Sequence, residues 1–152
     1  MPAVVSDASV LICLGALRHL QLLRDLYGEI VVPDAVWREV TVVAATRPGA
    51  QETIQASQQG WLKVQTPGNR ALVKSLQTTL DAGEAEAIAL ASELGASLLL
   101  MDGGDGRAEA RSLGVAVTGT VGVLLRAKQT GVVPAVKPLL DTLITQHHFR
   151  LS

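Results

Sequence analysis

Short strand-like runs and longer helix-like segments alternate along almost the whole of this 152-residue sequence. The strand-like runs cover residues 3–6, 30–32, 61–65, 97–101 and 115–117. Alternation of this kind predicts strands that pair in parallel, with the intervening helices on both faces of the sheet. We therefore expect an α/β protein, a three-layer α/β/α sandwich around a central, mostly parallel sheet of four to five strands.

The expected helices have recognisable start and stop signals. The first begins near Ser9, and its nearly continuous apolar face extends until Gly28 ends it. Pro33 can open the next helix as its first residue. The later helices are expected at residues 83–94, 105–113, 121–130 and 134–147. Pro48-Gly49 and Pro67-Gly68 are the strongest loop signals in the first half. Without a linker or an internal repeat, we expect residues 1–152 to form one domain.

Composition narrows the classes of function. A formal charge of −1 gives no whole-surface attraction for a polyanion, so contact with nucleic acid requires a local patch or a bound metal ion. An aromatic content of 3% argues against a base-stacking platform. The single cysteine, Cys13, cannot form an internal disulfide, and neither a signal peptide nor a membrane-spanning run is evident. We expect a cytoplasmic protein with no membrane association.

Two of the strand-like runs end on an aspartate. Asp7 follows the first run and Asp102 follows the fourth. In a parallel α/β sheet the carboxyl ends of the strands form the edge at which ligands bind, so both aspartates should face one crevice. A carboxylate cluster suits a hard divalent cation and, through that cation, phosphate chemistry. The alternative for Asp7 is a helix N-cap.

Glu39 is a third acidic candidate. Helical spacing places Val36, Val40 and Val43 in one stripe, and Glu39 lies at the edge of that stripe. Burying an unpaired carboxylate is costly, so either a metal ion or a partner is expected there. The alternative is a boundary residue that reaches solvent or pairs with an arginine, Arg38 or Arg47.

Glu84 is a fourth candidate with two competing interpretations. It shares a helix face with Ile88 and Ala91, whereas Glu86 lies on another side of the same helix. Asp81 and Glu84 also have the spacing of a capping box. A glutamate engaged in a cap can hardly reach into a cleft at the sheet edge, so the two interpretations exclude each other at this stage.

Five stretches of the chain, taken together, resemble the PIN-domain superfamily, the fold of VapC-type toxin ribonucleases. The closest resemblance is to a largely uncharacterised PIN-like branch of bacteria and archaea. The matching stretches are residues 4–9, 32–40, 81–91, 99–102 with 106–107, and 117–122. They span nearly the whole chain in the family's order, so the resemblance implies a PIN-like fold.

The resemblance also implies a set of site residues. The family's acidic quartet, which is catalytic and binds Mg²⁺ or Mn²⁺, maps onto Asp7, Glu39, Glu84 and Asp102. Glu84 replaces the aspartate that is commoner in the toxins. Asp105 is the nearest acid after the fourth motif and is a further candidate metal ligand, because positions 103 and 104 are glycines.

Hydroxyl and basic side chains complete the expected site. Ser9 and Thr120 are candidates to orient carboxylates or water, or alternatively to cap helices. Arg107 and Arg111 are candidates to hold the phosphate backbone of a substrate, or alternatively to form a solvated helix face.

Metal-dependent cleavage of RNA is the leading functional hypothesis. Clustered carboxylates repel one another, and a divalent cation relieves that repulsion and lowers the pKa of a coordinated water, so that hydroxide attacks phosphorus. The resemblance implies that the substrate is RNA and that the protein is the toxin of a toxin–antitoxin pair with a small antitoxin partner. It also implies that the protein forms a homodimer. The alternatives are a catalytically weak or inactive PIN-like module that binds nucleic acid or protein, and a small-molecule phosphohydrolase.

Overall fold

The computed structural model describes residues 2–147, and its centre is a five-stranded sheet whose strands all run parallel. The order across the sheet is β3-β2-β1-β4-β5. The strands are β1 (Val4–Ser6), β2 (Ile30–Val32), β3 (Leu62–Val64), β4 (Leu98–Leu100) and β5 (Val117–Thr118). The predicted α/β class and parallel sheet are confirmed.

The central strands are short apolar runs because both of their faces are covered. All three residues of β1 and all three of β2 are buried, as parallel strands in a three-layer fold require. Strands β1 and β4 lie side by side, with Val5 opposite Leu99 and Ser6 opposite Leu100. The chain order reverses between these two strands, since β2 and β3 lie on one side of β1 and β4 and β5 lie on the other.

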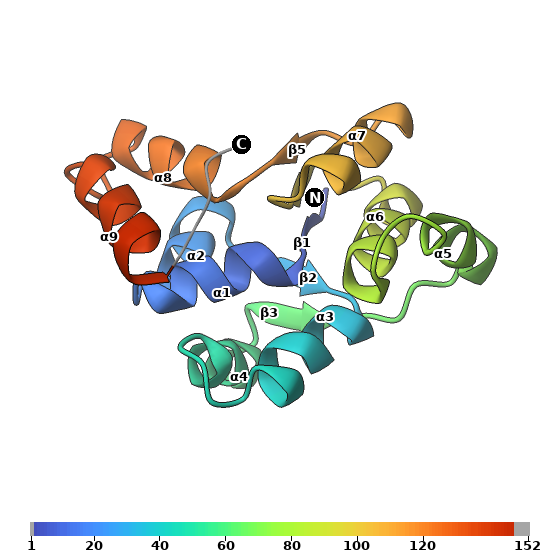
Figure 1. The fold of residues 1–152 in the computed structure, drawn as a ribbon, viewed down its shortest axis with the longest axis horizontal. Helices are drawn as coiled ribbons and strands as arrows, with labels where there is room; N and C mark the ends of the chain where they lie inside the picture. The colour runs from blue at the N-terminus through green and yellow to red at the C-terminus, as the bar shows by residue number, and fades with distance from the viewer. Residues whose placement is uncertain (1, 148–152) are drawn as a thin grey trace.

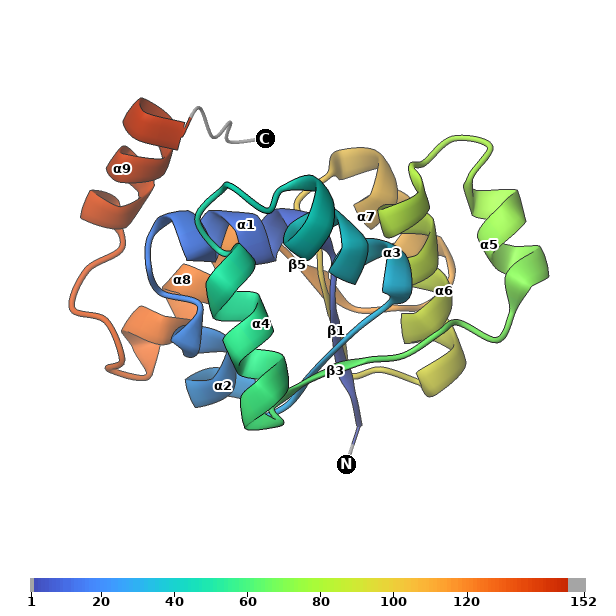
Figure 2. The same cartoon turned by 90° about the horizontal axis from the view of Figure 1, so that it is seen from below.

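Helices cover the two faces of the sheet, as Figures 1 and 2 show. Those on one side are α1 (Ala8–Ala16), α2 (Gln21–Tyr27), α4 (Ala50–Gln59), α8 (Thr120–Gln129) and α9 (Lys137–His147). Those on the other side are α3 (Asp34–Arg38), α5 (Arg70–Leu76), α6 (Ala82–Leu94) and α7 (Gly104–Ser112). A π-helical turn, η1 (Glu39–Val43), continues directly from α3. Within residues 2–147, no helix is both long enough and apolar enough to cross a bilayer.

The expected long helix before Gly28 is wrong, because the chain breaks it into α1 and α2. Arg18 has a φ of 61°, a left-handed conformation that ends α1 after Ala16. Leu17 and Leu20 are nevertheless buried on either side of this turn. The apolar pattern therefore continued through a turn that packs its leucines into the same core, and periodicity alone did not reveal the break.

Four further elements differ from expectation. Helix α9 begins at Lys137, three residues later than expected. Strand β5 begins two residues later than expected, because the Val115 N–H bonds the Ala110 carbonyl at 3.0 Å and so closes α7. Helices α4 and α5 were not predicted. Helix α4 buries only small side chains, those of Ala50, Thr53 and Ala56, so it lacks the apolar stripe that reveals a helix in sequence.

Two glycines determine how closely α4 approaches α1. A Cβ atom on Gly15 would overlap the backbone of Gly49 at its Cα and N atoms. Gly49 has a φ of 105° and precedes the first residue of α4. The two chain segments therefore touch backbone to backbone, which only glycine permits.

Gly15→Ala should lower the free energy of unfolding by about 1–3 kcal/mol, because the added methyl group overpacks this contact. Chemical denaturation measures the loss. Gly104→Ala is the matched control: Gly104 opens α7, nothing lies within 4 Å of its added Cβ, and the change should cost nothing. Equal stability of both variants would contradict the close approach.

Candidate active site

The carboxyl ends of β1 and β4 meet at the point where the strand order reverses. The Asp7 N–H donates to the carbonyl of Leu100 at 2.9 Å, so the first residue after β1 is joined directly to β4. Ligands of open α/β sheets bind in the crevice at such a switch point. The structure therefore brings Asp7 and Asp102 to one edge of the sheet, as the strand pattern predicted.

Asp7 is a buried helix cap. Its side chain is 4% exposed and precedes α1, where it accepts hydrogen bonds from the Ser9 hydroxyl at 2.7 Å and the Val10 N–H at 3.4 Å. Burial raises the pKa of this carboxyl from 3.8 to about 8, and the carboxylates of Asp102 and Glu84 add to the rise. Without a cation nearby, Asp7 holds a proton at neutral pH.

Asp102 faces Thr120. One carboxylate oxygen accepts from the Thr120 N–H and the other from the Thr120 hydroxyl, both at 2.7 Å. The Asp102 N–H donates to the Ser9 hydroxyl oxygen at 3.3 Å, while that hydroxyl donates to Asp7. Ser9 therefore links the two aspartates, and Thr120 fixes the orientation of the second one.

Glu84 takes part in a capping box and also reaches the cleft, so the two interpretations do not exclude each other. Asp81 accepts the Glu84 N–H at 2.8 Å, and the Asp81 N–H donates to Oε1 of Glu84 at 3.4 Å. Oε2 of Glu84 points toward Gly103, where a Cβ atom would lie 2.7 Å from it. Burial raises the pKa of Glu84, and the charges of Asp81 and Glu39 add to the rise.

Glu39 opens the π-helical turn η1 and is half-buried. Its Oε1 would lie 3.2 Å from a Cβ on Gly83, so the absence of a side chain there allows Glu39 to approach α6. Burial and then the charge of Asp81 raise the pKa of Glu39. Within residues 2–147 it pairs with neither Arg38 nor Arg47.

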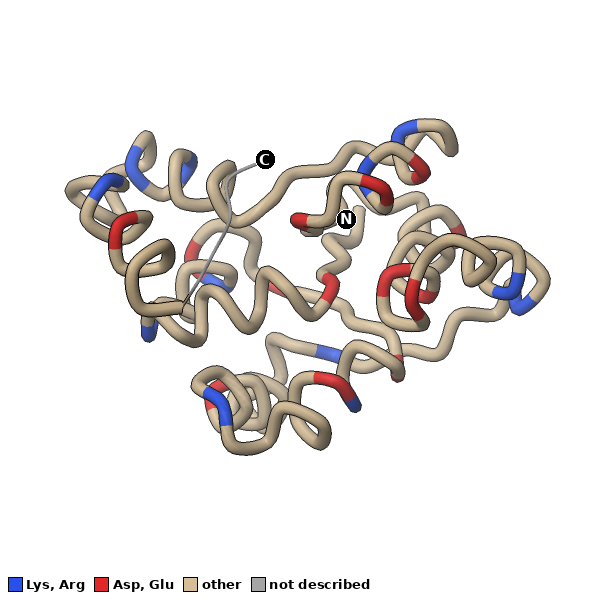
Figure 3. Tube along the Cα trace, viewed as in Figure 1, with Lys and Arg blue, Asp and Glu red and all other residues tan. Residues whose placement is uncertain are grey.

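One cavity of about 340 Å³ collects these acids, and we call it the acidic cavity. The residues that line it are Asp7, Ala8, Ser9, Ile12, Cys13, Glu39, Asp81, Gly83, Glu84 and Gly103. Three of the four predicted acids are therefore on its wall, and Asp102 adjoins it through Ser9. Figure 3 shows acidic positions gathered near the centre of the molecule, around the first turns of α1, α6 and α7.

The donors in the acidic cavity fit a hard divalent cation. Carboxylate oxygens are the ligands that Mg²⁺ and Mn²⁺ prefer. Gly83, Gly103 and Gly119 leave open the space beside the oxygens of Glu39, Glu84 and Asp102 that a Cβ atom would occupy. Among residues 2–147, no three acidic, histidine or cysteine side chains already stand close enough together to hold an ion. Binding would therefore draw the carboxylates inward.

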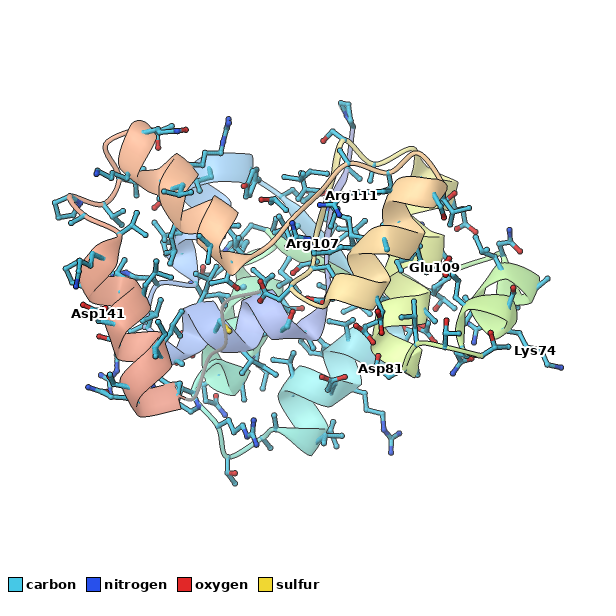
Figure 4. All side chains as sticks on the ribbon, turned by 45° about the horizontal axis from the view of Figure 1, so that its top comes forward. Lys74, Asp81, Arg107, Glu109, Arg111 and Asp141 are labelled. Atoms are coloured by element: carbon cyan, nitrogen blue, oxygen red, sulfur yellow. The ribbon has the colours of Figure 1, made fainter. Side chains whose placement is uncertain are left out.

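Several predicted residues lie elsewhere. Asp105 is exposed in the first turn of α7 and does not line the acidic cavity. Arg107 and Arg111 lie on one face of α7, away from Asp81 at the start of α6 (Figure 4). Arg107 is half-buried, and its Nε has no hydrogen-bond partner among residues 2–147.

Glu86, the neighbour of Glu84 along α6, has a structural role. It is only 9% exposed, accepts the Ala35 N–H at 3.1 Å and pairs with Arg70 at 3.5 Å. It therefore ties α6 to α3 and α5. It lies outside the acidic cavity, which makes it a natural control for Glu84.

Asp81 and Cys13 line the acidic cavity but were not predicted to belong to the site. The capping-box spacing of Asp81 and Glu84 was the available signal, since it places both carboxylates at the same end of α6. Burial, reinforced by the charge of Asp102, raises the pKa of Cys13 to about 11. Its thiol is therefore protonated and unsuited to nucleophilic attack.

A family model described as PIN domain matches residues 3–152, and the chain belongs to this family. Proteins of this family are commonly nucleases and typically use divalent metal ions. The fold is similar to that of a PilT N-terminus domain protein from the hyperthermophilic archaeon Sulfolobus solfataricus P2, with 20% identity and a TM-score of 0.49 over 99% of this chain and 100% of that one. Among curated proteins there is no significant match.

The raised pKa of Asp7 predicts a pH-dependent stability. Between its unfolded value of 3.8 and its folded value of about 8, the folded protein holds a proton that the unfolded chain has lost. Stability of the metal-free protein should therefore fall as pH rises through this window, by up to about 1.4 kcal/mol per pH unit from this group.

Asp7→Asn should remove this contribution, because the amide oxygen keeps the bonds from Ser9 and Val10 without a charge to bury. Urea unfolding in EDTA across the window measures the slope. Asp25→Asn, an exposed acid on α2, is the control and should keep the wild-type slope. An unchanged slope in Asp7→Asn would show that Asp7 is ionised in the folded protein.

Proposed function

We propose that this protein is a metal-dependent ribonuclease that hydrolyses phosphodiester bonds at the acidic cavity. The observation that carries the proposal is the convergence of Asp7, Glu39 and Glu84 on one cavity, from three different elements, at the switch point of the sheet. Burial first, and then the charges of neighbouring carboxylates, raise the pKa of all three acids, and a divalent cation would stabilise their ionised forms. Family membership supports the same class of chemistry.

Each residue has a role that its surroundings support. Asp7, Glu39 and Glu84 would hold Mg²⁺ or Mn²⁺, with Asp102 as a fourth carboxylate beside them. A bound divalent cation supplies charge stabilisation for the phosphate and a lowered pKa for water. Ser9 orients Asp7, and Thr120 orients Asp102, through the hydrogen bonds described above.

A toxin–antitoxin context is part of the same proposal. In that context a small antitoxin protein would hold the nuclease inactive, and the nuclease itself would act as a homodimer. The family membership supports this context only at the level of the fold.

Cleavage of a mixed pool of structured RNA should require Mg²⁺ or Mn²⁺ and stop in EDTA. Glu84→Gln should reduce the rate by about a hundredfold or more, because it removes a charged ligand, and Asp7→Asn should do the same. Glu86→Gln is the matched control on the same helix and should retain wild-type cleavage, since glutamine still accepts the Ala35 N–H. Gel analysis of product formation measures the rates.

Two outcomes would contradict the proposal. Cleavage that persists in both Asp7→Asn and Glu84→Gln would place the chemistry elsewhere. RNA that is bound but never cut, with either metal, would favour the non-catalytic binding module instead. The hydrogen bonds that occupy both oxygens of Asp102 are the observation that favours this second candidate.

Metal binding should also stabilise the fold, and more strongly at higher pH. An ion that binds only the folded state adds about 2.7 kcal/mol at a concentration a hundred times its Kd. Asp7 must lose its proton to act as a ligand, so the Mn²⁺-induced rise in Tm should grow as pH approaches about 8. Thermal melting with and without Mn²⁺ measures the rise. A shift that is absent, or equal in Glu84→Gln, would count against the site.

A further inference from the structure

A second cavity, of about 600 Å³, opens next to the acidic cavity. The two cavities share Ile12, Glu39, Asp81 and Gly83 as lining residues, so they form neighbouring parts of one depression on the surface. Arg38 and Arg47 also line the second cavity, and we call it the arginine cavity. The arginine cavity therefore contains two basic residues as well as the acids Glu39 and Asp81.

The two arginines are available to a ligand. Both are exposed, and within residues 2–147 neither forms an ion pair with an acidic side chain. The guanidinium group is always charged and presents a planar fork of donors that matches a phosphate group. The two arginines therefore supply donors for an anion in a cavity whose other charged lining residues, Glu39 and Asp81, are acidic.

One apolar residue of the arginine cavity is strongly exposed. Val43 lines it and is 74% exposed, and its neighbour Val42 on η1 is 60% exposed. An apolar surface flanked by cations suits a polymer that carries both apolar faces and anionic groups. A polynucleotide strand has both.

We infer that the arginine cavity holds the phosphate backbone of an unpaired polynucleotide strand, with Arg38 and Arg47 on phosphates that flank the one in the acidic cavity. The inference rests on the proposed function and names the path of its substrate. An unpaired strand can bend so that successive phosphates enter two adjoining cavities, whereas a duplex presents its phosphates on a stiff rod. Because Glu39, Glu84 and Asp81 repel phosphate, cationic side chains beside them would stabilise the bound strand.

This path differs from the one expected at Arg107 and Arg111. Those two residues line neither the acidic cavity nor the arginine cavity. Arg38, by contrast, precedes Glu39 directly in the chain, so an anchoring contact at Arg38 is tied to an acid of the site. One binding experiment therefore distinguishes the two paths, because each path predicts that a different pair of arginines is needed for RNA binding.

The test is fluorescence anisotropy of a labelled single-stranded RNA in EDTA, where binding is measured without cleavage. Arg38→Gln/Arg47→Gln should weaken binding by about tenfold or more. The slope of log K against log salt should also become less steep by about 1.4, because each lost phosphate contact contributes about 0.7. Arg24→Gln/Lys74→Gln is the matched control, because it removes two exposed cations from α2 and α5 that line neither cavity. It should bind as the wild type does.

Two further probes test the phosphate contact itself. A neutral-backbone analogue of the same sequence should lose the difference between the two double variants. Single-stranded DNA should show the same dependence on Arg38 and Arg47 as RNA, because phosphates are common to both. A dependence seen with RNA alone would indicate contacts to the 2′-hydroxyl and would overturn the backbone assignment.

The inference fails if Arg38→Gln/Arg47→Gln binds RNA as tightly as its control, or if Arg107→Gln/Arg111→Gln is the pair that weakens binding. Its failure is separate from that of the proposed function. If the protein cuts RNA and none of the four arginines is needed for binding, the proposed nuclease function stands and the inferred strand path is wrong. If the protein never cuts RNA but binds it through Arg38 and Arg47, the inferred strand path stands and the proposed nuclease function is wrong.

Discussion

The position of β1 between β2 and β4 is the constraint on which the rest of this structure depends. Because all three strands run parallel, their carboxyl ends lie at one edge, and the bond from the Asp7 N–H to Leu100 fixes the end of β1 against β4. Helices that leave this edge must start beside one another. The acids that begin those helices are thereby brought to a common cavity, although they come from distant parts of the chain.

Helix starts serve two purposes at this edge. Asp7 caps α1, while Asp81 and Glu84 cap α6, and the positive end of a helix favours a negative charge. Burial nevertheless dominates, because the pKa values of Asp7 and Glu84 are raised despite these caps. The metal-free cavity therefore carries less charge than its acid content suggests, and a cation would restore the full charge by displacing protons.

Glycine gives the carboxylates the space that they need. Gly83 admits Glu39, Gly103 admits Glu84 and Gly119 admits Asp102. The glycine at position 103 therefore has a structural reason, since a Cβ atom there would lie 2.7 Å from Oε2 of Glu84. This packing also explains how a glutamate, one methylene longer than the family's usual aspartate, fits at position 84.

The sequence by itself determined the alternation of strands and helices, the parallel sheet and the aspartates at two strand ends, because these follow from local periodicity and from residues adjacent in the chain. It did not reveal the break at Arg18, since buried leucines continue across it, or α4, which buries only small side chains. The site was predictable as a set of acids. Only the tertiary structure decided that Asp81 lines the acidic cavity and that Thr120 donates hydrogen bonds to both carboxylate oxygens of Asp102. It also decided that Arg38 and Arg47 line a cavity that adjoins the acidic one. These relations depend on the packing distances between elements far apart in the chain, which no local pattern encodes.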